Sequence, residues 1–345
     1  MMRPLRRIAA LLALCLTTSA AVGCGYTAIS PTVEQAQKLP ADDAASRLTA
    51  LIAKDQRVAE IAWRLALSNA DLCPVTRLRA GWVLQSAGQY STELRPVAER
   101  QYGLQGDLPG ILSAPLNSPA RAAGLRPGDL ILAIEGEPLN SGAGGGRESY
   151  DGLQANIDRL NSAAVMGPMS LTVRRNGTER AVAVMPVQAC AYVTQVEVRD
   201  DLRALSDGRT IFLSARIVDV AQDDHQLAFL LAHELAHAVL EHATVPDVQG
   251  ERGALNTSLS LRRGLSSRAE SDADTLGLYL LTRAGFDPRL AMQFLNAYAA
   301  TAPGARYPQI NLRGVYPSIP DRHRALEPVV SEIIDKQATG MPLIP

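Results

Sequence analysis

The residues of this sequence best suited to chemistry lie in the stretch FLLAHELAHAVLEH, residues 229–242. His233 and His237 are four residues apart, so both imidazoles would lie on one face of an α-helix. Glu234 follows His233 by about 100° of helical rotation, which places its carboxylate beside a metal ion held by the two histidines. In this arrangement zinc activates a water molecule and the carboxylate takes its proton. The alternative is an apolar helix that happens to carry two histidines.

A catalytic zinc ion also needs a third protein ligand and an open position. A further histidine after a glycine, as in the metzincins, is excluded because the two required positions hold Leu240 and Ala243. His242 is five residues from His237 and would point about 140° away from its face of the helix. We therefore expect His242 to have a structural role.

The other candidate for the third ligand is the segment SRAESDADTLGLYLLTRAGFDP, residues 267–288. Glu270 and Asp274 are again four residues apart on a predicted helix. The glutamate could bind zinc, and the aspartate one turn later could accept a hydrogen bond from the outer nitrogen of a histidine ligand. The alternative is a solvated helix face, because Arg268 and Asp272 lie in the same segment.

HELAH, the Glu-x-x-x-Asp pair and LTRAGFDP together resemble the HtpX/BepA-like zinc metallopeptidases, which are relatives of the CAAX prenyl endopeptidases. The resemblance covers about residues 195–330. It implies one Zn²⁺ per chain and assigns these roles: His233, His237 and Glu270 as ligands, Glu234 as general base, and Asp274 as hydrogen-bond partner of a ligand. It also implies a compact, largely helical gluzincin domain with a small β-sheet. The expected edge strand, RTIFLSA (209–215), would hold the substrate backbone.

The C-terminal part of the chain both follows and departs from this family. Its members usually carry His-Pro, with an arginine six residues after the histidine, and this chain has Tyr316-Pro317 and Arg322. The resemblance implies that Arg322 stabilises an anion near the zinc ion. Tyr316 stands where the family has histidine, and its phenol could donate a hydrogen bond to an oxyanion or simply pack.

A second pattern, SPARAAGLRPGDLILAIEGEPL, occupies residues 118–139. It predicts a short helix that ends at Gly124, a Pro-Gly turn and an apolar strand. Asn176-Gly177 then predicts a two-residue hairpin. The ordered match resembles the PDZ domain of bacterial proteases, which implies capture of peptide termini or extended peptides by strand addition. The carboxylate-binding loop is expected at QYGLQ (101–105), and the alternative is an unrelated small β domain.

Length predicts two or three folded domains, and the predicted elements together with the two resemblances imply an α+β protein. The chain has 345 residues, of which 47% are apolar and 20% charged, and its net charge of −1 gives no support for nucleic-acid binding. Residues 42–70 predict one long helix, or two with a break near Asp55. The expected order is a helical segment (26–98), a β-rich PDZ domain (99–188) and a mainly helical zinc-peptidase domain (191–337).

The N-terminus has the pattern of an export signal. Basic residues precede a short apolar stretch and the sequence AVGC, which predicts a signal peptide over residues 1–23. Ala-Val-Gly-Cys resembles a bacterial lipobox, which implies lipidation of Cys24 and a place on the periplasmic side of the cell envelope, at the outer rather than the inner membrane. The alternative is ordinary signal-peptidase cleavage. Cys73 and Cys190 then remain as a candidate disulfide or as two buried thiols.

These patterns favour an exported, lipid-anchored zinc endopeptidase. Its PDZ domain would capture peptide termini, and its substrates would be misfolded or unassembled envelope proteins. An alternative is an envelope adaptor or chaperone with a latched or inactive metal domain, but an inactive domain has no chemical need for Glu234. A zinc aminopeptidase ranks last, because no feature of the sequence is dedicated to holding a substrate amine.

Overall fold

A computed structural model describes residues 41–142, 147–206, 209–242, 267–301 and 319–345 of this chain, which is an α+β protein. Its helices are α1 (Ala41–Ser68), α2 (Arg95–Tyr102), α3 (Pro119–Ala122), α4 (Asp151–Val165), α5 (Ala215–Val220), α6 (Asp224–Val239), α8 (Ser267–Arg283), α9 (Pro288–Ala291), α10 (Gln293–Thr301), α11 (Ile319–Thr339) and the short 3₁₀ helix η2 (Ala87–Gln89). Its strands are β1 (Thr76–Arg79), β2 (Val83–Gln85), β3 (Gly110–Ser113), β4 (Leu130–Ile134), β5 (Glu137–Pro138), β6 (Met169–Arg175), β7 (Thr178–Val184), β8 (Val187–Cys190), β9 (Val193–Glu197), β10 (Ala204–Ser206) and β11 (Thr210–Ser214).

The first unit is built on an antiparallel sheet of order β2-β3-β4-β6-β7, with β5 added to β4. Its core includes residues from the sheet, the loops and α4 that are fully buried, among them Ile111, Leu125, Ile131, Leu153 and Val173. The predicted hairpin between β6 and β7 is present, because Asn176 and Gly177 both have positive φ (51° and 79°). The stretch QYGLQ spans the end of α2 and leads toward β3, an inner strand of this sheet.

The N-terminal segment is less helical than expected. Helix α1 is a single element that continues through Asp55 without a break. Two strands follow it within the range 26–98: β1 pairs with β8, and β2 is the outer strand of the large sheet. The sequence did not reveal these strands because they are only four and three residues long, too short for a clear alternation of polar and apolar residues.

The second unit combines a three-stranded sheet with the C-terminal helices. In this sheet β11 lies in the centre, parallel to β9 and antiparallel to β10. The expectation that RTIFLSA is the edge strand is therefore wrong, since both of its edges are paired. Residues 215–220 also form helix α5 rather than a continuation of the strand. The Ser214 hydroxyl begins this helix by accepting a hydrogen bond from the N–H of Ile217 at 3.2 Å.

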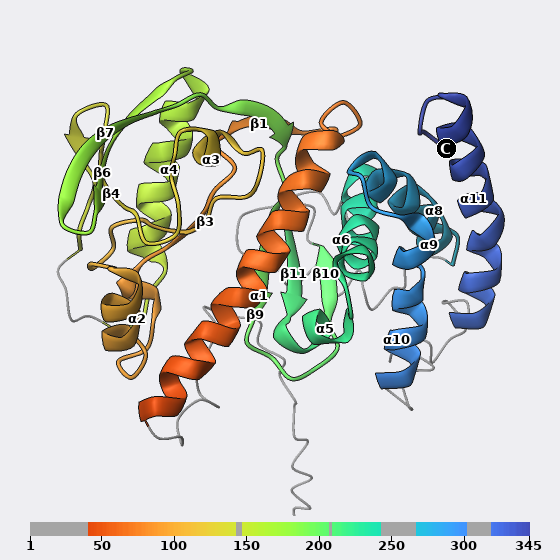
Figure 1. The fold of residues 1–345 in the computed structure, drawn as a ribbon, viewed down its shortest axis with the longest axis horizontal. Coiled ribbons are helices and arrows are strands. Elements are labelled where there is room, and N and C mark those ends of the chain that lie inside the picture. Colours follow the sequence, from red (N-terminus) through yellow and green to blue (C-terminus); the bar gives the residue numbers. More distant parts are fainter. Residues whose placement is uncertain (1–40, 143–146, 207–208, 243–266, 302–318) are drawn as a thin grey trace, which may run out of the picture.

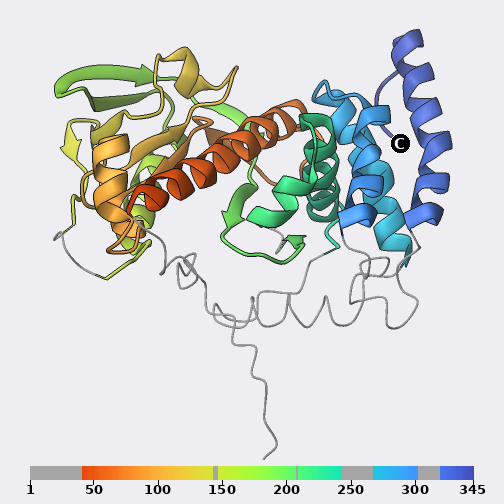
Figure 2. The same ribbon diagram turned by 60° about the horizontal axis from the view of Figure 1, so that its bottom comes forward.

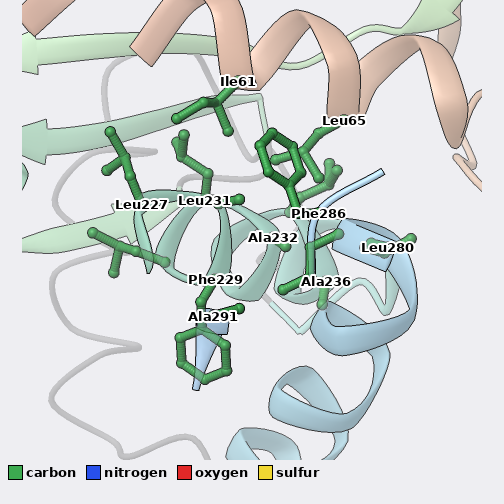
Figure 3. Packing of buried hydrophobic residues seen from close by; sticks show 14 of the residues in the cluster. Ile61, Leu65, Leu227, Phe229, Leu231, Ala232, Ala236, Leu280, Phe286 and Ala291 are labelled. Carbon is green, nitrogen blue, oxygen red and sulfur yellow. The ribbon is translucent and has the colours of Figure 1, made fainter. Parts of the chain in front are cut away.

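Helix α1 joins the two units, because it crosses the molecule between the large sheet and the C-terminal helices (Figures 1 and 2). Its first half buries Leu48 and Ile52 in a cluster with residues of α2 and β3. Its second half buries Ile61 and Leu65 in the core around α6 and α8. Figure 3 shows these two side chains above Leu231 of α6. One helix thus belongs to both hydrophobic cores.

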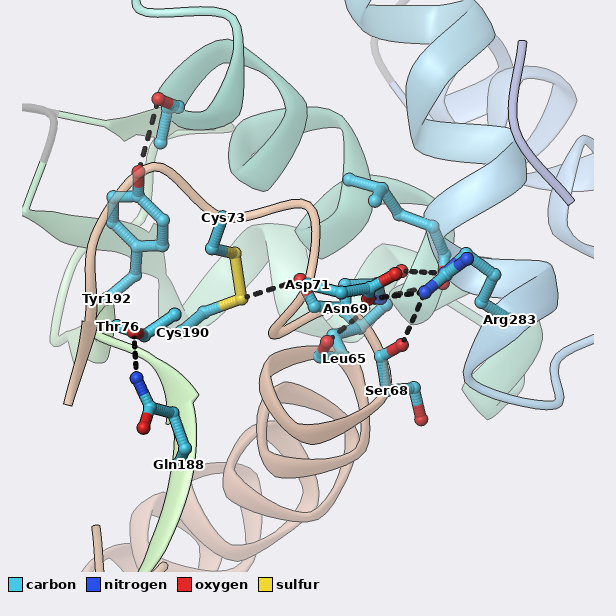
Figure 4. Close-up of a disulfide and its surroundings, with 12 residues drawn as sticks. Leu65, Ser68, Asn69, Asp71, Cys73, Thr76, Gln188, Cys190, Tyr192 and Arg283 are labelled. Atoms are coloured by element: carbon cyan, nitrogen blue, oxygen red, sulfur yellow. Dashed lines mark hydrogen bonds and ion pairs between the residues drawn. A yellow bond between two sulfur atoms is a disulfide. The ribbon is translucent and has the colours of Figure 1, made fainter. Parts of the chain in front are cut away.

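The chain also passes between the two units at β1 and β8, which pair with each other in an antiparallel register. Cys73, just before β1, forms a disulfide with Cys190 at the end of β8, and their Cα atoms are 5.6 Å apart (Figure 4). The two cysteines are 117 residues apart in sequence, so the bond closes a loop that contains the whole first unit. Nearby, buried Asn69 donates to the carbonyl oxygens of Leu65 and Leu280 and connects α1 to α8.

No helix among the described residues is both long and apolar enough to cross a membrane. The predicted signal peptide and Cys24 fall in residues 1–40, outside the part of the chain that the structure describes.

Candidate metal centre

The histidine pair is presented by α6, which lies in the core of the second unit. The helix begins at Asp223, whose carboxylate accepts a hydrogen bond from the N–H of Gln226 at 2.9 Å. Its apolar side chains pack against α1, α8 and α9, which leaves a helix with almost no exposed surface. His233, Glu234 and His237 are themselves at most 8% exposed. Buried polar groups of this kind need partners, and α8 supplies them for the two histidines.

Helix α8 approaches α6 closely because of a glycine. A Cβ atom at Gly277 would lie 3.2 Å from the backbone nitrogen of His233, so a larger residue would push the two helices apart. Glu270, Asp274 and Gly277 follow one another at intervals of four and three residues and share one face of α8. The glycine brings the two carboxylates to the histidines. Its spacing from Glu270 and Asp274 is the signal in the sequence that could have revealed this close approach.

His233, His237 and Glu270 converge on one point. The Nε2 atoms of the two histidines are 3.0 Å apart, and each lies 3.4 Å from an oxygen of Glu270. Ligands of a tetrahedral zinc ion with bonds of about 2.0–2.1 Å are roughly 3.3 Å apart. Two imidazole nitrogens and a carboxylate are also a common donor set for this metal. The three residues therefore fit a zinc ion without rearrangement.

The Nδ1 side of His233, which faces away from Glu270, is held by Asp274 and, through it, by Arg322. Its Nδ1 lies 2.9 Å from Oδ1 of Asp274, and because a carboxylate only accepts, Nδ1 must carry the proton. Nε2 is then the atom that can present a lone pair to a metal ion, once it loses the second proton that the cationic ring carries. Asp274 in turn accepts two hydrogen bonds from the guanidinium of Arg322, at 2.8 and 2.6 Å. The sequence had proposed that Asp274 contacts a histidine ligand, but it had not proposed the contact between Asp274 and Arg322.

The outer face of His237 also has a partner. Its Nδ1 lies 3.0 Å from Nδ1 of His242, and the two rings meet edge to face. The expectation that His242 points away from this face is wrong, because α6 ends at Val239 and the chain then turns back.

Electrostatic interactions among these buried residues keep Glu270 and Asp274 ionised. Burial alone would lower the pKa of His233, but hydrogen bonds to Asp274 and Glu270 outweigh it and raise the pKa to about 10. Burial alone would raise the pKa of Glu270, yet hydrogen bonds to the two histidines hold it well below its usual range. The pKa of Glu234 is raised, mainly by burial, which makes the carboxylate a stronger proton acceptor than a solvated one.

Two other residues assigned from the sequence have different outcomes. The guanidinium of Arg322 donates a hydrogen bond to Asp274 and so positions the carboxylate of that residue. The expected role of Arg322 in stabilising an anion near the zinc ion stays a prediction. Tyr316 lies outside the described residues, and its role stays a prediction as well.

Comparison with known proteins finds two family models that match parts of the chain. A sequence model of the PDZ domain matches residues 111–146, and one of peptidase family M48 matches residues 181–252, a range that contains α6 and ends before α8. The mitochondrial metalloendopeptidase OMA1 of Schizosaccharomyces pombe is 27% identical over 151 residues. This match covers 39% of the present chain and 44% of that protein, so the chain spans less than half of its relative's length.

Proposed function

From the premise that this chain is an M48 metallopeptidase with a PDZ domain, we propose that it is a zinc-dependent endopeptidase of the gluzincin type. The observation that carries the proposal is the convergence of His233, His237 and Glu270 on one buried point. His233 and His237 belong to α6, whereas Glu270 belongs to α8, a helix that is distant in sequence. The distances between the ligand atoms of these three residues nevertheless match those around a tetrahedral zinc ion.

The roles of the residues follow from their positions. Bound zinc would supply Lewis acidity and would lower the pKa of a bound water to about 7. Glu234 would take the proton of the attacking water and deliver it to the leaving amine, and burial raises its pKa, which strengthens it as a base. Asp274 and Arg322 would fix the tautomer and orientation of His233.

The substrates we propose are unfolded or unassembled proteins that enter as extended segments. An extended peptide can add to an outer strand, and the outer strands of the PDZ sheet are β2 and β7. In the peptidase unit β10 is the outer strand that contacts α6, so it replaces RTIFLSA as the proposed strand for the substrate backbone. The PDZ domain would capture peptide termini and deliver them to this unit.

Export is part of the proposal and rests on the sequence. The basic, apolar and small-residue order of residues 1–24 supports a signal peptide and lipidation of Cys24. The protein would then act on the periplasmic side of a bacterial envelope, anchored to the outer membrane.

Zinc content and proteolysis together test this function. Purified residues 25–345 should contain about one zinc ion per chain and cleave unfolded casein. A chelator should abolish cleavage, and added Zn²⁺ should restore it. His237→Ala should contain little zinc and cleave nothing. A wild-type protein that binds no zinc would contradict the proposal, and zinc binding without any cleavage would favour the adaptor alternative.

A further inference from the structure

We propose that His242 is a positioning residue for the metal centre. It would hold His237 in the tautomer and orientation that zinc binding requires. This inference rests on the proposed function, because it concerns the same metal ion. The sequence had suggested only a structural role for His242, because on a continuous helix its side chain would point away from the metal ion.

The end of α6 explains how His242 reaches the site. The last helical residue is Val239, and Glu241 adopts a positive φ of 54°, which reverses the chain. The N–H of His242 then donates to the carbonyl oxygen of His237 at 2.9 Å. This backbone bond fixes His242 against the last turn of α6, directly behind the imidazole of His237.

The hydrogen bond between the two rings determines their tautomers. The Nδ1 atoms are 3.0 Å apart, so one must donate and the other must accept. Nε2 of His237 faces Glu270 and Nε2 of His233, and it needs a lone pair to bind a metal ion. Nδ1 of His237 is therefore the donor. His242 accepts at Nδ1 and carries its own proton on Nε2.

Both histidine ligands thus have an acceptor behind them, but the two acceptors differ in charge. His233 donates to the carboxylate of Asp274, which is buried and itself held by Arg322. His237 donates to a neutral imidazole. Outer partners of this kind typically change metal affinity by about 10–100-fold when removed. We expect a loss of this order when His242 can no longer accept.

Two substitutions separate the hydrogen bond from the bulk of the side chain. His242→Leu removes the acceptor and keeps an apolar side chain. His242→Asn places an amide oxygen near the position of Nδ1 and can accept the same hydrogen bond. The matched control is His225→Leu. His225 lies on the same helix and accepts a hydrogen bond from the N–H of Asp287 at 2.8 Å, which is a structural contact.

The readout is the dissociation constant for Zn²⁺, measured by competition with a chromophoric chelator, together with the unfolding temperature of each metal-free variant. We expect zinc binding about 10–100-fold weaker in His242→Leu, and within about threefold of wild type in His242→Asn. His225→Leu should lower the unfolding temperature and leave the zinc affinity unchanged. Should His242→Leu fail to fold, His242→Ala takes its place.

The inference is overturned if His242→Leu binds zinc as tightly as wild type, or if His242→Asn is as weak as His242→Leu. Either result would leave the proposed function intact, because the wild-type protein would still bind zinc. A wild-type chain that binds no zinc would instead refute the proposed function itself.

Discussion

At the scale of single residues, the site depends on buried charges that are paired. Asp274 is 2% exposed and has two partners, His233 and Arg322. Its pKa falls to about 2, because these cationic partners outweigh the effect of burial, which alone would raise it. A carboxyl group with a lowered pKa stabilises the fold only while it is ionised.

This lowered pKa predicts the behaviour of the metal-free protein in acid. The contribution of Asp274 and Glu270 to the free energy of unfolding should be complete above about pH 5 and should shrink as the pH falls, because the unfolded chain takes up these protons near pH 4 and the folded protein takes them up only near pH 2 and below. Asp274 alone should account for roughly 2 kcal/mol over the whole transition, about half of which is lost by pH 3. Denaturant unfolding of chelator-treated protein across pH 3–8 measures it.

Two variants complete this experiment. Asp274→Asn should be less stable at pH 7 and should lose less stability in acid, because it has no proton to gain. Asp272→Asn, an exposed neighbour on α8, should follow the wild-type curve. Identical slopes for wild type and Asp274→Asn would contradict the assignment of Asp274 as an ionised partner of His233.

Residue spacing proposed the candidates for this site, and the family resemblance assigned their roles. The i, i+4 pairs on α6 and α8 identified His233, His237, Glu270 and Asp274 before any contact between the helices was known. Spacing failed for His242, because the helix ends three residues earlier and no capping glycine in the sequence marks that end. The partner of Arg322 could not be predicted either, since it depends on how α11 packs against α8.

At the scale of elements, the contact between α6 and α8 controls the metal centre. Gly277→Val should force α8 away from the backbone of His233, because even a Cβ atom there would lie 3.2 Å from it. Overpacking of this kind usually costs about 1–3 kcal/mol. Glu270 would move with α8, so we expect zinc affinity to fall at least tenfold. Titration with Zn²⁺ and thermal unfolding measure the two effects.

The control for this prediction is Ser271→Val, an exposed position on the same helix. It introduces the same side chain and should leave zinc affinity unchanged. Wild-type zinc affinity in Gly277→Val would show that close packing at this glycine does not set the position of Glu270.

Elements were harder to predict than residues. The α+β class, the long helix α1 and the Asn176-Gly177 hairpin follow from local patterns. The order β10-β11-β9 does not, because an apolar strand such as RTIFLSA reads the same at the centre and at the edge of a small sheet. Strands β1 and β2 could not be predicted because they are only four and three residues long.

At the scale of the whole molecule, two connections hold the PDZ unit against the peptidase unit. Helix α1 belongs to both cores, and the disulfide between Cys73 and Cys190 closes the loop that contains the PDZ unit. A loop of this length restricts the unfolded chain strongly. We infer that both connections stabilise one fixed arrangement of the two units.

The disulfide prediction follows from this restriction. Replacing both cysteines with alanine should lower the free energy of unfolding by about 2–5 kcal/mol. Denaturant unfolding with and without a thiol reductant measures it. The reductant should destabilise the wild-type protein and leave the double variant unchanged. Equal stability of the oxidised and reduced wild-type protein would contradict a role for the bond in holding the units together.

The most direct test of zinc-dependent proteolysis at this site is the cleavage of casein by Glu234→Gln compared with wild type, with zinc content measured in the same samples. Glu234 is not among the three converging ligands, so the variant should retain about one zinc ion per chain. We predict that it loses at least about 99% of the activity, because the water has no base. Cleavage at the wild-type rate by zinc-loaded Glu234→Gln would contradict the assignment of Glu234 as the general base and of this centre as the site of proteolysis.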